Sequence, residues 1–149
     1  NSSVMVKFQS GYYTLKNTRK YVGTKVPRYR SGWEFSFMRF CDEHPNIIAW
    51  SSEPVKIPYR NPFTGKYTVY VPDFLVTYLN KKGRRFSELI EIKPRAETIL
   101  EAAKTVKHRA TIVLNRAKWK AAGEWSKRKG IRFRILNEDN IYKMKPKSR

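Results

Sequence analysis

The stretch YVPDFLVTYLNKKGRRFSELIEIKP, residues 70–94, predicts a β-hairpin in which two apolar strands flank the polar turn NKKGRR. Asp73 begins the first strand, and Glu91 comes late in the second, two residues before Lys93. Antiparallel pairing places the start of one strand beside the end of the other, so both carboxylates are expected at the same end of a sheet. Glu91 and Lys93 leave the same face, because side chains alternate along a strand.

Two carboxylates at one sheet end are costly to ionise unless a cation lies near them. The residues leave two sources of positive charge open. One is ordinary salt bridging to Arg84, Arg85 or Lys93. The other is a divalent metal ion bound by Asp73 and Glu91, with the lysine beside it, which would suit phosphodiester hydrolysis.

Composition narrows the classes of partner and cofactor. The chain has 149 residues and 32 Lys and Arg against 12 Asp and Glu, a net charge of +20. Such a charge favours a polyanion, and nucleic acid before a membrane surface. One cysteine and two histidines exclude a disulfide framework and a zinc site, so a metal would be held by oxygen, as Mg²⁺ or Mn²⁺ is. With no signal peptide and no apolar run of about 18 residues, we expect no membrane partner.

Periodicity along the rest of the chain predicts a single α/β domain, a mixed and mostly antiparallel sheet flanked by helices. Ser31 and Glu34 fit a capping box at the start of a helix that Pro45 ends. A helical pattern starts again at Ala96, and ATIVL (110–114) fits either a strand or a helix. The other expected elements are strands near 55–59, 67–71 and 131–136, a helix over 115–129 closed by Gly130, and a short helix over 137–144.

The two ends of the chain are basic. Residues 1–29 form an arm in which Tyr12, Tyr13 and Tyr21 alternate with cations, a mixture that either packs onto the domain or stacks on bases. The packing interpretation is favoured. The tail 143–149 is expected to be disordered, and Trp33, Trp50, Trp119 and Trp125 are expected in the core.

The motifs VPDF and EIK, on apolar strands that follow a helix with a glutamate, resemble the PD-(D/E)xK nuclease superfamily. The matching residues are Pro72, Asp73, Glu91 and Lys93, with Glu34 at the first-helix position. More narrowly, YRSGWEFSFMRFCDEHPNIIAWSSEPVKIPY, YVPDF, EIKP and NRAKWKAA are similar to the head-completion nucleases of tailed phages and to the TnsA-like endonucleases of transposons. The resemblance spans roughly residues 28–136 and implies a restriction-endonuclease-like fold.

The resemblance also implies a set of site residues. Asp73, Glu91 and the backbone carbonyl of Ile92 would ligate Mg²⁺, with Mn²⁺ able to substitute, and Glu34 would reach the metal or its waters. Lys93 would act on the attacking water, and Glu53 is a weaker candidate that more simply begins a strand. Cations expected to contact DNA are Lys16, Arg19, Lys20, Arg30, Lys118 and Lys120.

The function expected from these features is metal-dependent endonuclease action on DNA ends or branched DNA during phage head completion after packaging. Its partners would be DNA and phage head, portal or neck proteins, in the host cytoplasm or in the virion. Two alternatives stay open: a DNA-end-binding protein that does not cut, and a transposition or repair nuclease. Adjacent carboxylates favour an enzyme, because a pure binder would gain nothing from groups that repel phosphate.

Overall fold

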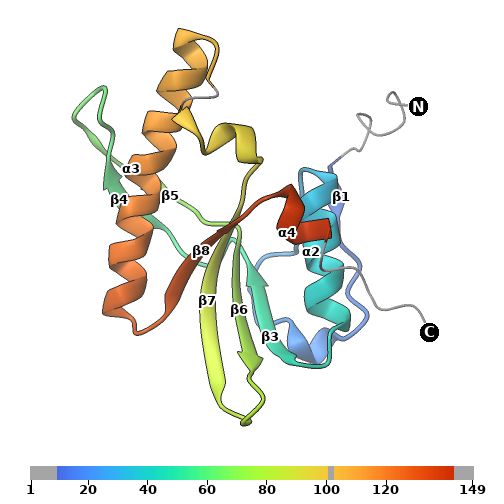
Figure 1. Cartoon of the computed structure of the whole chain (residues 1–149). Helices are drawn as coiled ribbons and strands as arrows, with labels where there is room; N and C mark the ends of the chain where they lie inside the picture. The colour runs from blue at the N-terminus through green and yellow to red at the C-terminus, as the bar shows by residue number, and fades with distance from the viewer. Residues whose placement is uncertain (1–9, 101–102, 143–149) are drawn as a thin grey trace, which may run out of the picture.

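The computed structural model describes residues 10–100 and 103–142. Its centre is a four-stranded sheet in the order β3-β6-β7-β8, made of β3 (Ile47–Ser52), β6 (Phe74–Leu79), β7 (Arg85–Ile92) and β8 (Arg132–Leu136) (Figure 1). β6 pairs antiparallel with both β3 and β7, whereas β7 and β8 are parallel. The mixed, mostly antiparallel sheet and the hairpin over residues 70–94 are therefore confirmed.

Three α-helices in the described ranges cover the two faces of this sheet (Figure 1). The long helix α3 (Val106–Arg128) lies on one face, and α2 (Gly32–Glu43) with the short α4 (Glu138–Tyr142) lies on the other. Alternation along β7 sends Ile90 and Ile92 into the α2-side core and Leu89 into the α3-side core. Glu91 therefore faces α3. None of the described helices has the length and apolar character that a membrane span needs.

The start of α2 confirms half of the predicted capping box. The Ser31 hydroxyl accepts a hydrogen bond from the Glu34 N–H at 3.1 Å. The Glu34 carboxylate, however, accepts from the N–H of Arg30 at 2.7 Å, one residue before the expected Ser31. The helix ends at Glu43, before Pro45, as expected.

Two segments differ from the sequence-based expectation. No strand was predicted over Ile47–Ser52, yet β3 forms there. The strand escaped prediction because residues on both of its faces are buried, so its sequence shows no alternation of apolar and polar residues. The helix expected from Ala96 is replaced by a 3₁₀ turn, η2 (Arg95–Glu97), and α3 begins only at Val106, with Thr105 as its N-cap. The ATIVL segment belongs to α3, and Ala102 lies outside the described residues.

The predicted strands near 55–59 and 67–71 form a separate hairpin, β4 (Ile57–Arg60) and β5 (Tyr67–Tyr70), and do not join the central sheet. One face of this hairpin packs on α3, where Ile57, Tyr59 and Tyr70 share a core with Trp119 and Ala122. The predicted Gly130 stop is confirmed by the end of α3 at Arg128 and by a φ of 71° at the glycine. Trp50 and Trp119 are buried as expected, while Trp33 and Trp125 are half-buried against the two cores.

The described part of the N-terminal arm, residues 10–29, contains β1 (Gly11–Tyr12) paired with β2 (Arg28–Tyr29) and a 3₁₀ turn, η1 (Thr18–Lys20). Tyr13 is buried, and Tyr21 meets the Trp50 ring edge-on with 4.8 Å between the ring centroids. These two tyrosines therefore pack onto the domain, whereas Tyr12 is exposed. Residues 1–9, and the tail 143–149 that was expected to be disordered, lie outside the described residues.

Asp42 fixes this arm to α2. Its buried carboxylate accepts hydrogen bonds from the Tyr13 hydroxyl and from the backbone N–H groups of Lys16 and Asn17, each at 2.9 Å. Burial alone would raise the pKa of Asp42, but these three donors outweigh it, so the pKa lies below its ordinary value.

We expect Asp42→Asn to lower the free energy of unfolding by about 2–3 kcal/mol, or roughly 5–10 °C in Tm, because hydrogen bonds to a charged group are lost. A carboxylate whose folded pKa is depressed stabilises the fold at neutral pH and loses that effect as the pH falls through the folded pKa. The difference between parent and variant should therefore shrink below about pH 4 in thermal melts. Glu43→Gln, which alters the exposed neighbour, should change stability by less than about 0.5 kcal/mol. An equal loss in both variants would contradict the anchoring role.

Candidate active site

Asp73 and Glu91 meet at one end of the central sheet, as the sequence predicts. Phe74 pairs with Ile90, and the same register continued by one residue sets Asp73 opposite Glu91. The N–H of Ile92 donates to the Asp73 carboxylate at 2.7 Å. This bond forms because β6 pairs only from Phe74 onward, which leaves the Asp73 side chain to take the last donor of β7.

The environment of these two carboxylates disfavours their charge. Burial raises the pKa of Asp73 well above its ordinary value, and the negative charges of Glu91 and Glu34 raise it further. Burial likewise raises the pKa of Glu91, although Tyr70 and Lys93 oppose the shift. Among the described residues, the buried Oε1 atom of Glu91 has no hydrogen-bond partner. The pair thus combines a half-buried Asp73 with a buried Glu91 whose Oε1 atom is unsatisfied, and a cation would satisfy that oxygen.

Lys93 lies beside the pair. Its Nζ atom is 3.9 Å from Oε2 of Glu91 and equally far from Oε1 of Glu97. Its backbone N–H donates to the carbonyl of Leu136 at 2.9 Å, which holds the residue to the end of β8. The side chain is 26% exposed, so the ammonium is within reach of both the acidic pair and an incoming ligand.

Glu34 comes close to the site without joining it. Burial raises the pKa of its carboxyl group, and its charge acts on Asp73, so the N-terminus of α2 lies near the acidic sheet end. Its side chain is nevertheless bound to the N–H of Arg30. Across residues 10–100 and 103–142, no three His, Cys, Asp or Glu side chains are arranged to hold a metal ion together.

Glu53 contributes through its backbone. Its N–H donates to the carbonyl of Asp73 at 2.8 Å, and its φ of 49° is unusual for a residue with a side chain. The carboxylate is bound to Arg30 at 2.6 Å and to Lys25 at 3.5 Å, and these cations keep the pKa of Glu53 below its ordinary value despite burial. Glu53 therefore fixes the position of Asp73, a role that the sequence did not reveal.

Tyr70 and Lys118 form the α3 side of the site. The Lys118 ammonium is 6.0 Å from the centroids of both the Tyr59 and the Tyr70 rings, a cation–π distance. Burial raises the pKa of Tyr70, and the charge of Glu91 raises it further. The buried Tyr70 hydroxyl makes no aligned hydrogen bond to any described residue. Sequence reasoning missed Tyr70, although its place three residues before Asp73, at the end of a strand, was a usable signal.

The six predicted DNA-binding cations do not form one group. Lys16 pairs with Glu43 at 2.9 Å, and Lys20 donates to the carbonyls of Asp42 and His44 at the C-terminal end of α2, so both have structural roles there. Arg19 lies in the same turn and is exposed. Arg30 and Lys118 lie within electrostatic reach of Asp73 and Glu91 respectively, whereas Lys120 is an exposed residue of α3.

The residues present fit a hard divalent cation. Mg²⁺ binds carboxylate and carbonyl oxygens, keeps several waters and often takes only one or two carboxylates from the protein. Asp73 and Glu91 supply two such groups, and the unsatisfied Glu91 oxygen supplies a free acceptor.

The chain is similar in sequence to known nucleases. The family described as TnsA-like endonuclease N terminal matches residues 44–138, a range that contains Asp73, Glu91 and Lys93 but not Glu34. The head completion nuclease of Enterobacteria phage T4 is 39% identical over 143 residues, which cover 89% of this chain and 93% of that protein.

We expect Asp73→Asn to melt at a higher temperature than the parent in chelator at pH 7. A carboxyl group with a raised folded pKa costs stability as the pH rises and it ionises, whereas Asn stays neutral and can still accept from Ile92. The gain should shrink as the pH falls through the folded pKa and vanish below about pH 3, where the carboxyl group is protonated in both states.

The same melts test the cation. Mg²⁺ at tenfold its Kd should raise the Tm of the parent by about 3–6 °C and leave Asp73→Asn unchanged. Glu97→Gln, which removes an acid beside Lys93 but outside the pair, should respond as the parent does. Equal shifts in the parent and in Asp73→Asn would place the ion elsewhere.

Proposed function

Because the chain belongs to the TnsA-like endonuclease N-terminal family, we propose that it is a metal-dependent DNA endonuclease of the PD-(D/E)xK type. One observation carries the proposal: the half-buried carboxylate of Asp73 and the buried carboxylate of Glu91 share a sheet end with a lysine, in a chain whose net charge is +20. A protein that only bound DNA would be weakened by this pair, because each carboxylate repels the phosphates that the basic surface attracts.

In this proposal Asp73 and Glu91, with the Ile92 carbonyl, hold Mg²⁺ or Mn²⁺. When bound, the ion supplies positive charge to the phosphate oxygens and activates water for attack. The protein's part is to keep the carboxylates in place. The Ile92 N–H bond to Asp73 and the Glu53 N–H bond to the Asp73 carbonyl hold that residue from two sides.

Lys93 is proposed to act on the reacting groups directly. Its ammonium has three donors and lies beside Glu91, so it can orient a water molecule or stabilise negative charge that develops on phosphate. Glu34 is proposed to assist from α2 through water, since its carboxylate is bound to the Arg30 N–H. Lys118, held over the rings of Tyr59 and Tyr70, would bind a phosphate oxygen on the α3 side.

The phage relative suggests the biological step. A match that covers 93% of the T4 head completion nuclease supports a nuclease role in head completion, and we propose DNA ends or branched DNA after packaging as the substrate. Head, portal or neck proteins would then be partners, in the host cytoplasm or in the virion. The family name favours a transposition nuclease as the second candidate, with the same chemistry.

We expect Asp73→Ala and Glu91→Ala to reduce Mg²⁺-dependent DNA cleavage roughly a thousandfold or more, and chelator to abolish cleavage by the parent. Binding should stay intact or tighten, since each change removes a negative charge that faces phosphate. Lys93→Ala should lose cleavage with binding only slightly weakened. Gel assays of cleavage and fluorescence anisotropy of binding measure the two properties separately.

Glu124→Ala is the matched control, because it removes an exposed acid on α3 outside the pair, and it should cut as the parent does. If the Asp73 and Glu91 variants also cut normally, the acidic pair is structural and the chain is a binder.

Glu34 separates capping from catalysis. Gln at this position keeps an oxygen for the Arg30 N–H and the backbone N–H for Ser31, so Glu34→Gln should melt within a few degrees of the parent. It should nevertheless lose most Mg²⁺-dependent cleavage, because it lacks the negative charge. Normal cleavage by Glu34→Gln, with early melting of Glu34→Ala, would make Glu34 a helix cap alone.

A further inference from the structure

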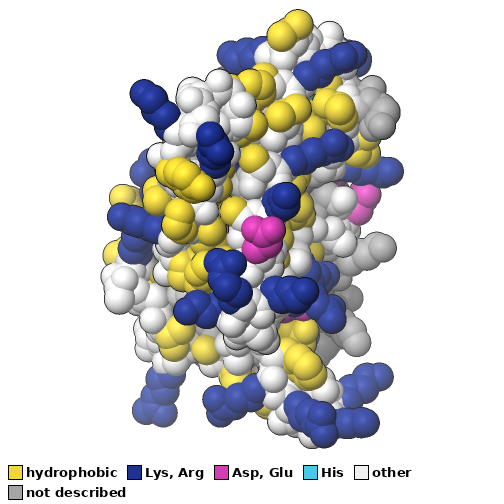
Figure 2. Space-filling model, turned by 90° about the vertical axis from the view of Figure 1, so that its left-hand side faces the viewer, with side chains coloured by type: hydrophobic (Ala, Val, Ile, Leu, Met, Phe, Trp, Pro, Cys, Tyr) yellow, Lys and Arg dark blue, Asp and Glu magenta, His cyan; other side chains and the backbone are white. Residues whose placement is uncertain are grey.

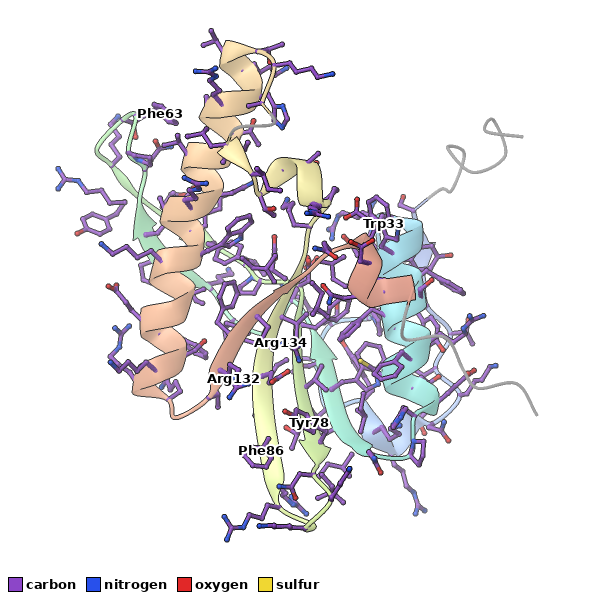
Figure 3. The ribbon with its side chains drawn as sticks, viewed as in Figure 1. Trp33, Phe63, Tyr78, Phe86, Arg132 and Arg134 are labelled. Carbon is purple, nitrogen blue, oxygen red and sulfur yellow. The ribbon has the colours of Figure 1, made fainter. Side chains whose placement is uncertain are left out.

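The β4–β5 hairpin has an outer face that the domain does not use. Pro58 pairs with Val69 and Arg60 with Tyr67, and these four exposed residues share the face opposite the one that packs on α3. Tyr67 is 76% exposed and Val69 51%. Phe63, at the tip of the hairpin, is 60% exposed (Figure 3). Exposed apolar groups gathered on one ribbon indicate a binding surface.

Charge identifies the class of ligand. Residues 54–72 contain Lys56, Arg60 and Lys66 and no acidic residue. The neighbouring α3 carries seven Lys and Arg against one acid, Glu124. Seen from the side of α3 and the hairpin, Lys and Arg spread over the face with hydrophobic side chains between them, and acidic groups are few (Figure 2). A surface that is both apolar and uniformly cationic suits nucleic acid, whose phosphates meet the cations and whose sugars meet the apolar groups.

The base of the hairpin, at the end of β5, lies beside the acidic site. Tyr70 ends β5 and influences Glu91, and Asp73 follows three residues later. From Tyr70 to the tip is about six residues, or roughly 20 Å of extended chain. At 3.4 Å per base pair, this length matches about six base pairs of duplex. The major groove, about 12 Å wide, admits a two-stranded ribbon.

We propose that the β4–β5 hairpin grips duplex DNA beside the scissile phosphate, with its outer face against a groove. Arg60 and Lys66 contact the phosphates, and Tyr67, Val69 and Phe63 contact the sugars and base edges. The inference rests on the proposed function for its ligand, and it assigns substrate contacts to a segment outside the nuclease motif.

The test measures affinity without cleavage. In an Asp73→Ala background, anisotropy with a labelled duplex of about 20 base pairs gives Kd over a range of salt concentrations. Removing two phosphate contacts by Arg60→Ala with Lys66→Ala should weaken binding and reduce the slope of log K against log salt by about 2. Phe63→Ala should weaken binding about fivefold or more.

The opposite end of the molecule supplies matched controls. Lys81→Ala with Lys82→Ala removes two exposed cations from the β6–β7 turn, and Phe86→Ala removes a partly exposed aromatic at that end of β7 (Figure 3). These variants should change the salt slope and the affinity by less than half as much. Arg60 also donates to the Gly65 carbonyl at 3.0 Å, so its loss could disturb the turn. Lys66→Ala alone is therefore measured too, because the Lys66 ammonium makes no hydrogen bond or ion pair with any described residue.

Equal losses at both ends would overturn the proposal, because binding would then be diffuse electrostatics. So would unchanged affinity in the hairpin variants while the parent still cuts DNA, since the hairpin would then contact something else, such as an acidic protein. If the parent fails to cut DNA but only the hairpin variants lose affinity, the result supports DNA contact by the hairpin and contradicts the nuclease function.

Discussion

The structure depends on a single register between β6 and β7. It places Asp73 opposite Glu91, and the bond from the Ile92 N–H ties one carboxylate to the strand that carries the other. Leu75 and Leu89 lie two residues inward on the same face and pack toward α3, so the core enforces the register that the acidic pair needs. A slip of either strand by one residue would move its leucine to the wrong face and separate Asp73 from Glu91.

The cations near α2 and β3 and the carboxylates of the acidic pair differ in how far their charge is compensated. At a net charge of +20 the folded state repels itself, yet Lys16, Lys20 and Arg30 are bound to carboxylates or carbonyls close to α2 and β3. The acidic pair receives less compensation, since the Lys93 ammonium is 3.9 Å from the Glu91 carboxylate. A site kept short of positive charge costs stability, and the two hydrophobic cores offset that cost.

The sequence was enough to predict the hairpin, the acidic pair and the α2 start, because these rest on local patterns: alternation, turn residues and a cap. What it did not predict depends on contacts between distant residues. Asp42 binds N–H groups 25 and 26 positions away, and Glu53 acts through a backbone bond to Asp73. β3 lacked alternation because both of its faces are buried, and Glu34 reached one residue further back than the standard cap. The metal-ligand roles stay predictions.

Binding and chemistry then fall to different parts of one surface. In the proposed function the free carboxylates repel phosphate, so attraction to DNA has to come from cations around the site. Lys118 lies over the rings of Tyr59 and Tyr70, and among the described residues no ion pair ties its ammonium to a carboxylate, although its charge acts on Glu91. The same tyrosines pack the β4–β5 hairpin onto α3, so the hydrophobic core between these elements holds the Lys118 side of the site in place. This arrangement lets a strongly basic chain keep a small acidic centre.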